Sequence, residues 1–72
     1  MTLQNPLSEI IFQMRNKGGG FVHSLVRPLE LADPENRAAL IQAFPGIFER
    51  YDALATMANK EKQDRIAANL AG

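Results

Sequence analysis

The feature that most constrains the fold of this sequence is the corner from Leu31 to Arg37, which reads LADPENR. The side chain of Asp33 can accept a hydrogen bond from a free backbone N–H at the start of a helix. Pro34 fits the first helical turn because its missing N–H has no partner there. Apolar residues recur at helical spacing on both sides. We therefore expect the corner to fold one amphipathic helix back on another.

Two helices are predicted before the corner, over residues 6–16 and 20–31. Asn5 is expected to cap the first helix, with Pro6 in its first turn. Pro28 lies inside the second helix and predicts a kink or a tightened last turn. The apolar residues that define the two helical stripes are Leu3, Leu7, Ile10, Ile11 and Met14 in the first, and Phe21, Val22, Leu25, Val26 and Leu29 in the second.

Three consecutive glycines separate these two helices, from Gly18 to Gly20. Gly18 is expected to end the first helix in the left-handed conformation that glycine adopts readily. The run is either a flexible hinge or a tight turn. A phosphate-binding loop is disfavoured, because the wider glycine spacing and the Lys-Ser/Thr pair of such loops are missing.

Two further helices are predicted after the corner, over residues 34–44 and 46–58, because Pro45 disfavours the helical conformation at Phe44. The segment from Asn59 to Arg65 is charged all round and leaves two alternatives. Asn59 caps a separate terminal helix over 60–71, or one long helix projects beyond the body. The predicted fold is an all-α domain of three to four helices built on a helical hairpin core.

The balance between size and apolar content predicts association with other chains. A chain of 72 residues holds one domain with a thin core, and it has no cysteine to form disulfides. Yet 46% of its residues are hydrophobic. Exposed apolar patches or a dimer face are therefore expected, and we predict a homodimer.

Several functional classes are disfavoured by composition. Eight basic and eight acidic residues cancel, which argues against nucleic-acid binding. No signal peptide or membrane span is visible, so a cytoplasmic protein is expected. The only histidine in the sequence is His23, whereas a zinc site needs three or four ligands. The sequence offers the carboxylate pairs Glu30/Glu35 and Glu49/Asp52, but it shows no sign of the pocket that acid–base catalysis requires. We predict no enzymatic activity, no cofactor and no metal.

The corner and the segment after it resemble a group of short, uncharacterised proteins encoded by bacteriophages and prophages. The resemblance covers about the middle half of the chain, and the residues that carry it are Leu31 to Asn36, Leu40, Phe44-Pro45, Phe48, Glu49 and Tyr51. It implies a phage origin and expression in the cytoplasm of a bacterial host. The group contributes no catalytic residue.

These observations favour a small helical interaction protein that binds and inhibits or modulates a host bacterial protein. Aromatic and Met side chains dominate interface energetics, so the candidate partner-binding residues are Phe12, Met14, Phe21, Phe48 and Tyr51. One alternative is a helix-turn-helix-like DNA-binding regulator. In that case Glu35, Asn36, Arg37 and Gln42 would line the recognition helix, and a dimer would gather Arg15, Lys17, Arg27 and Arg37 on one face. A further alternative is a minor structural component of the virion.

Overall fold

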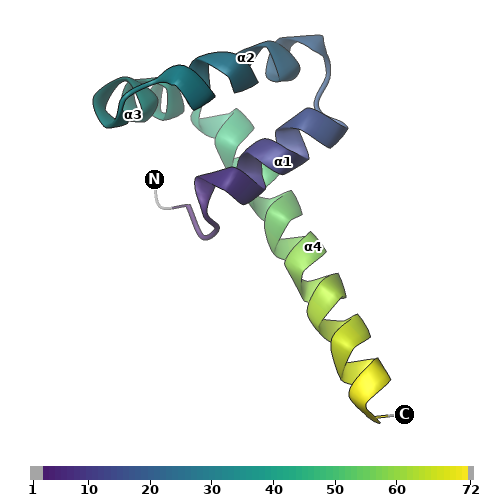
Figure 1. Ribbon diagram of the computed structural model, residues 1–72. Coiled ribbons are helices and arrows are strands. Elements are labelled where there is room, and N and C mark those ends of the chain that lie inside the picture. Colours follow the sequence, from purple (N-terminus) through teal and green to yellow (C-terminus); the bar gives the residue numbers. More distant parts are fainter. Residues whose placement is uncertain (1–2, 72) are drawn as a thin grey trace.

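The computed structural model describes residues 3–71 and contains four α-helices. Figure 1 shows the first three helices gathered around the first half of the fourth, whose second half extends away from them. The helices are α1 (Leu7–Lys17), α2 (Gly20–Leu31), α3 (Pro34–Ala43) and α4 (Pro45–Ala71). No strand occurs within residues 3–71, so the all-α prediction is confirmed. None of the helices in this range is both long and apolar enough to cross a bilayer.

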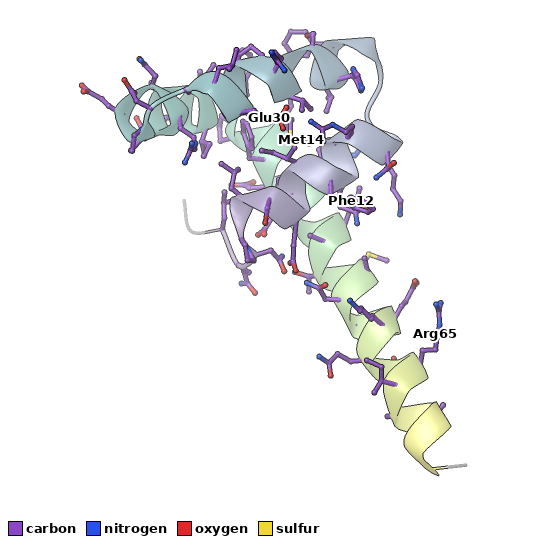
Figure 2. All side chains as sticks on the ribbon, in the orientation of Figure 1. Phe12, Met14, Glu30 and Arg65 are labelled. Carbon is purple, nitrogen blue, oxygen red and sulfur yellow. The ribbon has the colours of Figure 1, made fainter. Side chains whose placement is uncertain are left out.

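The core lies where α1 crosses α4 and is covered by α2. Its largest fully buried side chains are Ile10, Met14, Leu29 and Phe48. Figure 2 places Met14 in the space between α1 and α2. The apolar stripes predicted along the sequence therefore face inward, because their helical spacing puts one side of each helix against its neighbours.

The corner between α2 and α3 forms as predicted. Asp33 accepts a hydrogen bond from the backbone N–H of Asn36 at 2.8 Å, and Pro34 is the first residue of α3. The chain then returns toward the start of α2. There the rings of Phe21 and Phe44 pack edge to face in a T-shaped arrangement, with their centroids 5.6 Å apart. The prediction that this hairpin is the core is wrong. No side chain of α3 is fully buried, because the helix is short and rich in alanine.

Two predictions about helix ends are also wrong. Asn5 does not cap α1, which begins at Leu7 after Pro6, because the Asn5 side chain bonds to α4 instead. Gly18 is not left-handed, since its φ is −79°. Gly18 is required for space, because a Cβ there would collide with the Met14 carbonyl oxygen and lie 2.6 Å from Cγ1 of Val22. The glycine run is thus a tight link between α1 and α2.

The fourth helix is continuous over 27 residues. Of the two alternatives for the end of the chain, one long helix that projects beyond the body is confirmed, so the helix runs past residue 58 and a separate helix over 60–71 does not form. No Gly or Pro interrupts the chain between Ile47 and Ala71. We call residues 60–71 the α4 tip. All its side chains from Lys60 to Ala68 are exposed. The tip explains a radius of gyration of 14.0 Å, against about 11 Å for a compact domain of this length.

Candidate functional site

The five candidate partner-binding residues divide into two groups. Met14, Phe48 and Tyr51 are buried where α1, α2 and α4 meet, so their side chains are core and offer no surface to a partner in this fold. Phe12 and Phe21 are 62% and 59% exposed. Only these two of the five remain candidates for partner contact.

Sequence reasoning missed three further exposed apolar side chains, namely Leu31, Met57 and Ile66. Leu31 is 70% exposed, the most of any large hydrophobic residue in the part of the chain with described side chains. A signal for it was present in the sequence. Leu31 falls outside the spacing of Leu25, Val26 and Leu29, so it cannot share their buried side of α2.

An apolar groove lies between α2 and α3 beside the corner, with a volume of about 460 Å³. We call it the α2–α3 groove. Leu31 and the exposed ring of Pro28 come from α2, and the half-buried Leu40 comes from α3. Small side chains keep the groove open. The lining residues are Pro28, Leu31, Ala32, Asn36, Ala39 and Leu40.

A second groove of about 380 Å³ lies at the crossing of α1 and α4. We call it the α1–α4 groove. Its apolar part is formed by Ala55, Ala58 and the exposed ring of Phe12, which Figure 2 shows at this crossing. Residues spaced three and four apart on each helix line the groove, so each helix forms one of its walls. The lining residues are Ser8, Glu9, Phe12, Gln13, Ala55, Ala58, Asn59 and Lys62.

One residue of the α1–α4 groove is unusual. Gln13 is only 6% exposed, and its Oε1 atom is buried with no hydrogen-bond partner among the described residues. A buried amide oxygen without a donor is uncommon in folded proteins, because water has been removed from it and nothing replaces the lost hydrogen bond. Because Oε1 has almost no accessible surface, it is covered by its neighbours and is not open to the groove.

The N-terminal segment is fastened to α4 by an arrangement that we call the N-terminal clamp, formed by Gln4, Asn5 and Asp52. The Asp52 carboxylate accepts hydrogen bonds from the backbone N–H of Gln4 at 2.9 Å, from the backbone N–H of Asn5 at 3.0 Å and from the Asn5 amide at 2.8 Å. The Asn5 amide oxygen in turn accepts from Asn59 at 3.1 Å. Two segments about fifty residues apart in sequence are held together in this way.

The clamp determines the ionisation of Asp52. Burial raises the pKa of this carboxyl, but the hydrogen bonds from the Gln4 backbone and from the Asn5 side chain and backbone lower it by more, so the pKa lies below its ordinary value. Asp52 is thus a charged, fully engaged acceptor. Such a group is a structural anchor and is poorly suited to act as a general acid.

Two of the arginines considered for DNA recognition already bind groups within the chain. Arg37 is half-buried and donates to the Ala32 carbonyl oxygen at 3.1 Å. Arg15 forms an ion pair with Glu30 at 2.7 Å. Glu35, Asn36 and Gln42 are exposed along α3. The acidic Glu35 on this surface would face the phosphate backbone unfavourably.

The His, Asp and Glu side chains within residues 3–71 do not come together into a metal site. His23 is exposed on α2. Within residues 3–71, no three His, Asp or Glu side chains come together in a way that could hold a metal ion.

No protein-family model matches this chain, and no curated protein or solved structure is significantly similar to it.

Proposed function

We propose that this chain is a protein-binding module whose α2–α3 groove accepts the apolar face of a partner helix. The observation that carries the proposal is Leu31, which is 70% exposed at the edge of an apolar groove. Fully burying a leucine side chain is worth about 1.5–3 kcal/mol. An apolar residue held in this position favours association with a complementary surface.

The walls of the groove suit a helix. Ala32 at the corner and Ala39 of α3 have short side chains, which allow a partner backbone to approach closely. The Phe21–Phe44 pair forms a second apolar contact at the other end of the same two helices. An amphipathic helix docks in such a groove through residues spaced three and four apart.

The partner that we propose is a bacterial host protein, following the likeness of the corner to phage proteins. Binding by itself inhibits or redirects a protein when it covers a surface that the protein needs. This mode of action requires no catalytic residue, and the host cytoplasm is the compartment that we propose for it.

Affinity capture tests the proposal. The tagged chain is incubated with bacterial lysate, and the Leu31→Asp variant is expected to lose the retained protein because it places a charge in the groove. Met57→Asp is the matched control, since Met57 is also exposed but lies outside the α2–α3 groove. Both variants are checked for helicity by circular dichroism. Equal capture by the Leu31→Asp variant and the parent chain would contradict the proposal.

We also propose that the chain forms a homodimer through the α4 tip. Ile66 is 48% exposed on this tip, and its described neighbours from Lys60 to Ala68 are exposed as well. Sedimentation velocity at several concentrations is expected to show a dimer that Ile66→Lys abolishes. Gln63→Lys adds the same charge elsewhere on the tip and serves as the control. A monomer at every concentration would refute this.

A further inference from the structure

We propose that the α1–α4 groove receives the α4 tip of a second copy of this chain, in a two-fold dimer in which each tip lies in the groove of the other copy. This assignment rests on the homodimer proposed above and names the surface against which its tips pack. The surface is separate from the α2–α3 groove, with which the α1–α4 groove shares no lining residue.

The groove and the tip share one face of α4. The wall that α4 contributes to the groove consists of Ala55, Ala58, Asn59 and Lys62. Ile66 follows Lys62 by four residues, so it lies on the same face, about one turn beyond the groove. Figure 1 shows this part of α4 extending away from α1, α2 and α3. A partner that lies along the groove therefore also contacts the tip.

This face continues the face of α4 that packs in the core. Phe48, Tyr51 and Ala55 are buried on it where α1 crosses α4. Beyond the crossing the same spacing of three and four residues continues, but Lys62 and Ile66 are exposed. The face loses its cover only because α1 ends its contact there. A second copy can cover on the tip what α1 covers in the body.

The charges of the groove select a second copy as the occupant. Glu9 and Lys62 line the groove, and neither forms an ion pair with any described residue. Glu9 accepts a hydrogen bond from the Asn59 amide at 2.8 Å, and a carboxylate can accept further donors. A partner that presents a single charge would leave one of the two without a counter-charge.

Two-fold symmetry resolves this, because it brings residue i of one copy to residue j of the other and residue j to residue i. Glu9 of each copy then faces Lys62 of the other, so both charges of both grooves are complemented.

The apolar parts of the two surfaces also match. Phe12 is 62% exposed at the groove, and Ile66 is 48% exposed on the tip. At a rise of 1.5 Å per residue, Lys62 and Ile66 lie about 6 Å apart along α4, and the wall from Ala55 to Lys62 is about 10 Å long. Both side chains of one tip therefore fit in one groove, with Ile66 against Phe12 of the other copy.

Exchange of charges between copies tests the pairing. Glu9→Lys and Lys62→Glu each place like charges at both contacts of a homodimer, so each variant alone is expected to raise the dimer dissociation constant at least about tenfold in sedimentation velocity. In an equimolar mixture the two variants form a heterodimer in which both contacts again join opposite charges. The mixture is therefore expected to dimerise with an affinity close to that of the parent chain, which also shows that both variants fold.

Matched controls separate this pairing from general attraction between chains of opposite net charge. Lys60→Glu and Glu35→Lys make the same charge changes at exposed positions outside the groove, so each alone is expected to dimerise like the parent chain. Phe12→Ala is expected to weaken the dimer about tenfold. Met57→Ala is expected to leave it unchanged, because Met57 is similarly exposed but lies outside the groove.

The chain contains no cysteine, so introduced thiols report contact directly. Ser8→Cys, which lies in the groove, is mixed with Ile66→Cys and treated with a short thiol-reactive cross-linker. The main product is expected to join one variant to the other, and tags of different size identify it. Two Ile66→Cys chains are expected to cross-link poorly, because the two tips lie in separate grooves.

The possible results distinguish this assignment from the proposals on which it builds. A monomer at every concentration would overturn both the homodimer and the tip-in-groove contact. A dimer that tolerates Glu9→Lys and Lys62→Glu, a mixture that does not restore the dimer, or a main cross-link between two Ile66→Cys tips would overturn the tip-in-groove contact alone. Leu31→Asp should leave the dimer unchanged even though it removes the partner of the α2–α3 groove, and loss of the dimer in this variant would contradict two separate surfaces.

Discussion

At the scale of single residues, the tightest constraint in the structure is Gly18. It lies between α1 and α2 against Met14 and Val22, with ordinary negative φ, so steric space and not backbone conformation explains the need for glycine. Gly20, at the start of α2, has no neighbour within 4 Å of an added Cβ. Two glycines in one short run therefore have opposite tolerances for a methyl group.

We predict that Gly18→Ala lowers the free energy of unfolding by about 1–3 kcal/mol, because the added methyl group forces neighbouring atoms apart. Gly20→Ala is expected to raise it by up to about 1 kcal/mol, because alanine restricts the unfolded chain and fits the helix. Urea denaturation followed by circular dichroism measures both. Equal stabilities of the two variants would show that a methyl group at position 18 fits without forcing neighbouring atoms apart.

At the scale of elements, α4 combines two different environments in one helix. Its first half carries the core residues Phe48, Tyr51 and Ala55, whereas the α4 tip exposes every described side chain. An isolated helix of about a dozen residues is only marginally stable in water. The tip is therefore expected to fray independently of the body when the chain is monomeric.

A pair of identical substitutions separates these environments. Ala53→Gly is expected to lower the free energy of global unfolding by about 1 kcal/mol. Ala68→Gly should reduce helicity and leave the free energy of global unfolding unchanged. Both alanines are exposed, so neither change creates a cavity. Chemical denaturation at concentrations where the chain is monomeric provides the measurement. An equal loss of stability in the two variants would mean that the tip and the body unfold together.

At the scale of the whole molecule, the N-terminal clamp joins the beginning of the chain to the middle of α4. The buried cluster is small, so we expect a polar anchor of this kind to contribute to the stability. Asp52 lies at its centre and has a pKa below its ordinary value. A carboxyl of this kind stabilises the fold when it is charged, which makes stability depend on pH.

The sign of that dependence follows from the lowered pKa. The contribution of Asp52 is fully present above the pKa of the unfolded chain, about 3.9, and is lost as the pH falls through the lower pKa of the folded state. We predict that Asp52→Asn destabilises the chain at pH 7 by about 1–3 kcal/mol and reduces its loss of stability in acid. Thermal melts between pH 7 and pH 2 measure this, with Asp64→Asn on the exposed tip as the control. Parallel pH profiles for the parent and Asp52→Asn would contradict the assignment.

Much of the local structure could be predicted from the sequence. The spacing of apolar residues located all four helices, and the corner formed at Asp33 and Pro34 because its cap depends only on residues three apart. Local signals failed where a side chain had a distant competitor. Asn5 resembles a helix cap, but its side-chain amide donates hydrogen bonds to Asp52 and Thr56 across the molecule instead.

The sequence by itself determined which stretches are helical and which side of each helix is apolar, because both properties arise from contacts between near neighbours in the chain. It could not separate Met14, Phe48 and Tyr51, which are buried, from Phe12 and Phe21, which are exposed. Only the tertiary structure decided this, since burial depends on which helices cross and where. The same crossing created the α1–α4 groove and buried the Gln13 oxygen with no hydrogen-bond partner among the described residues.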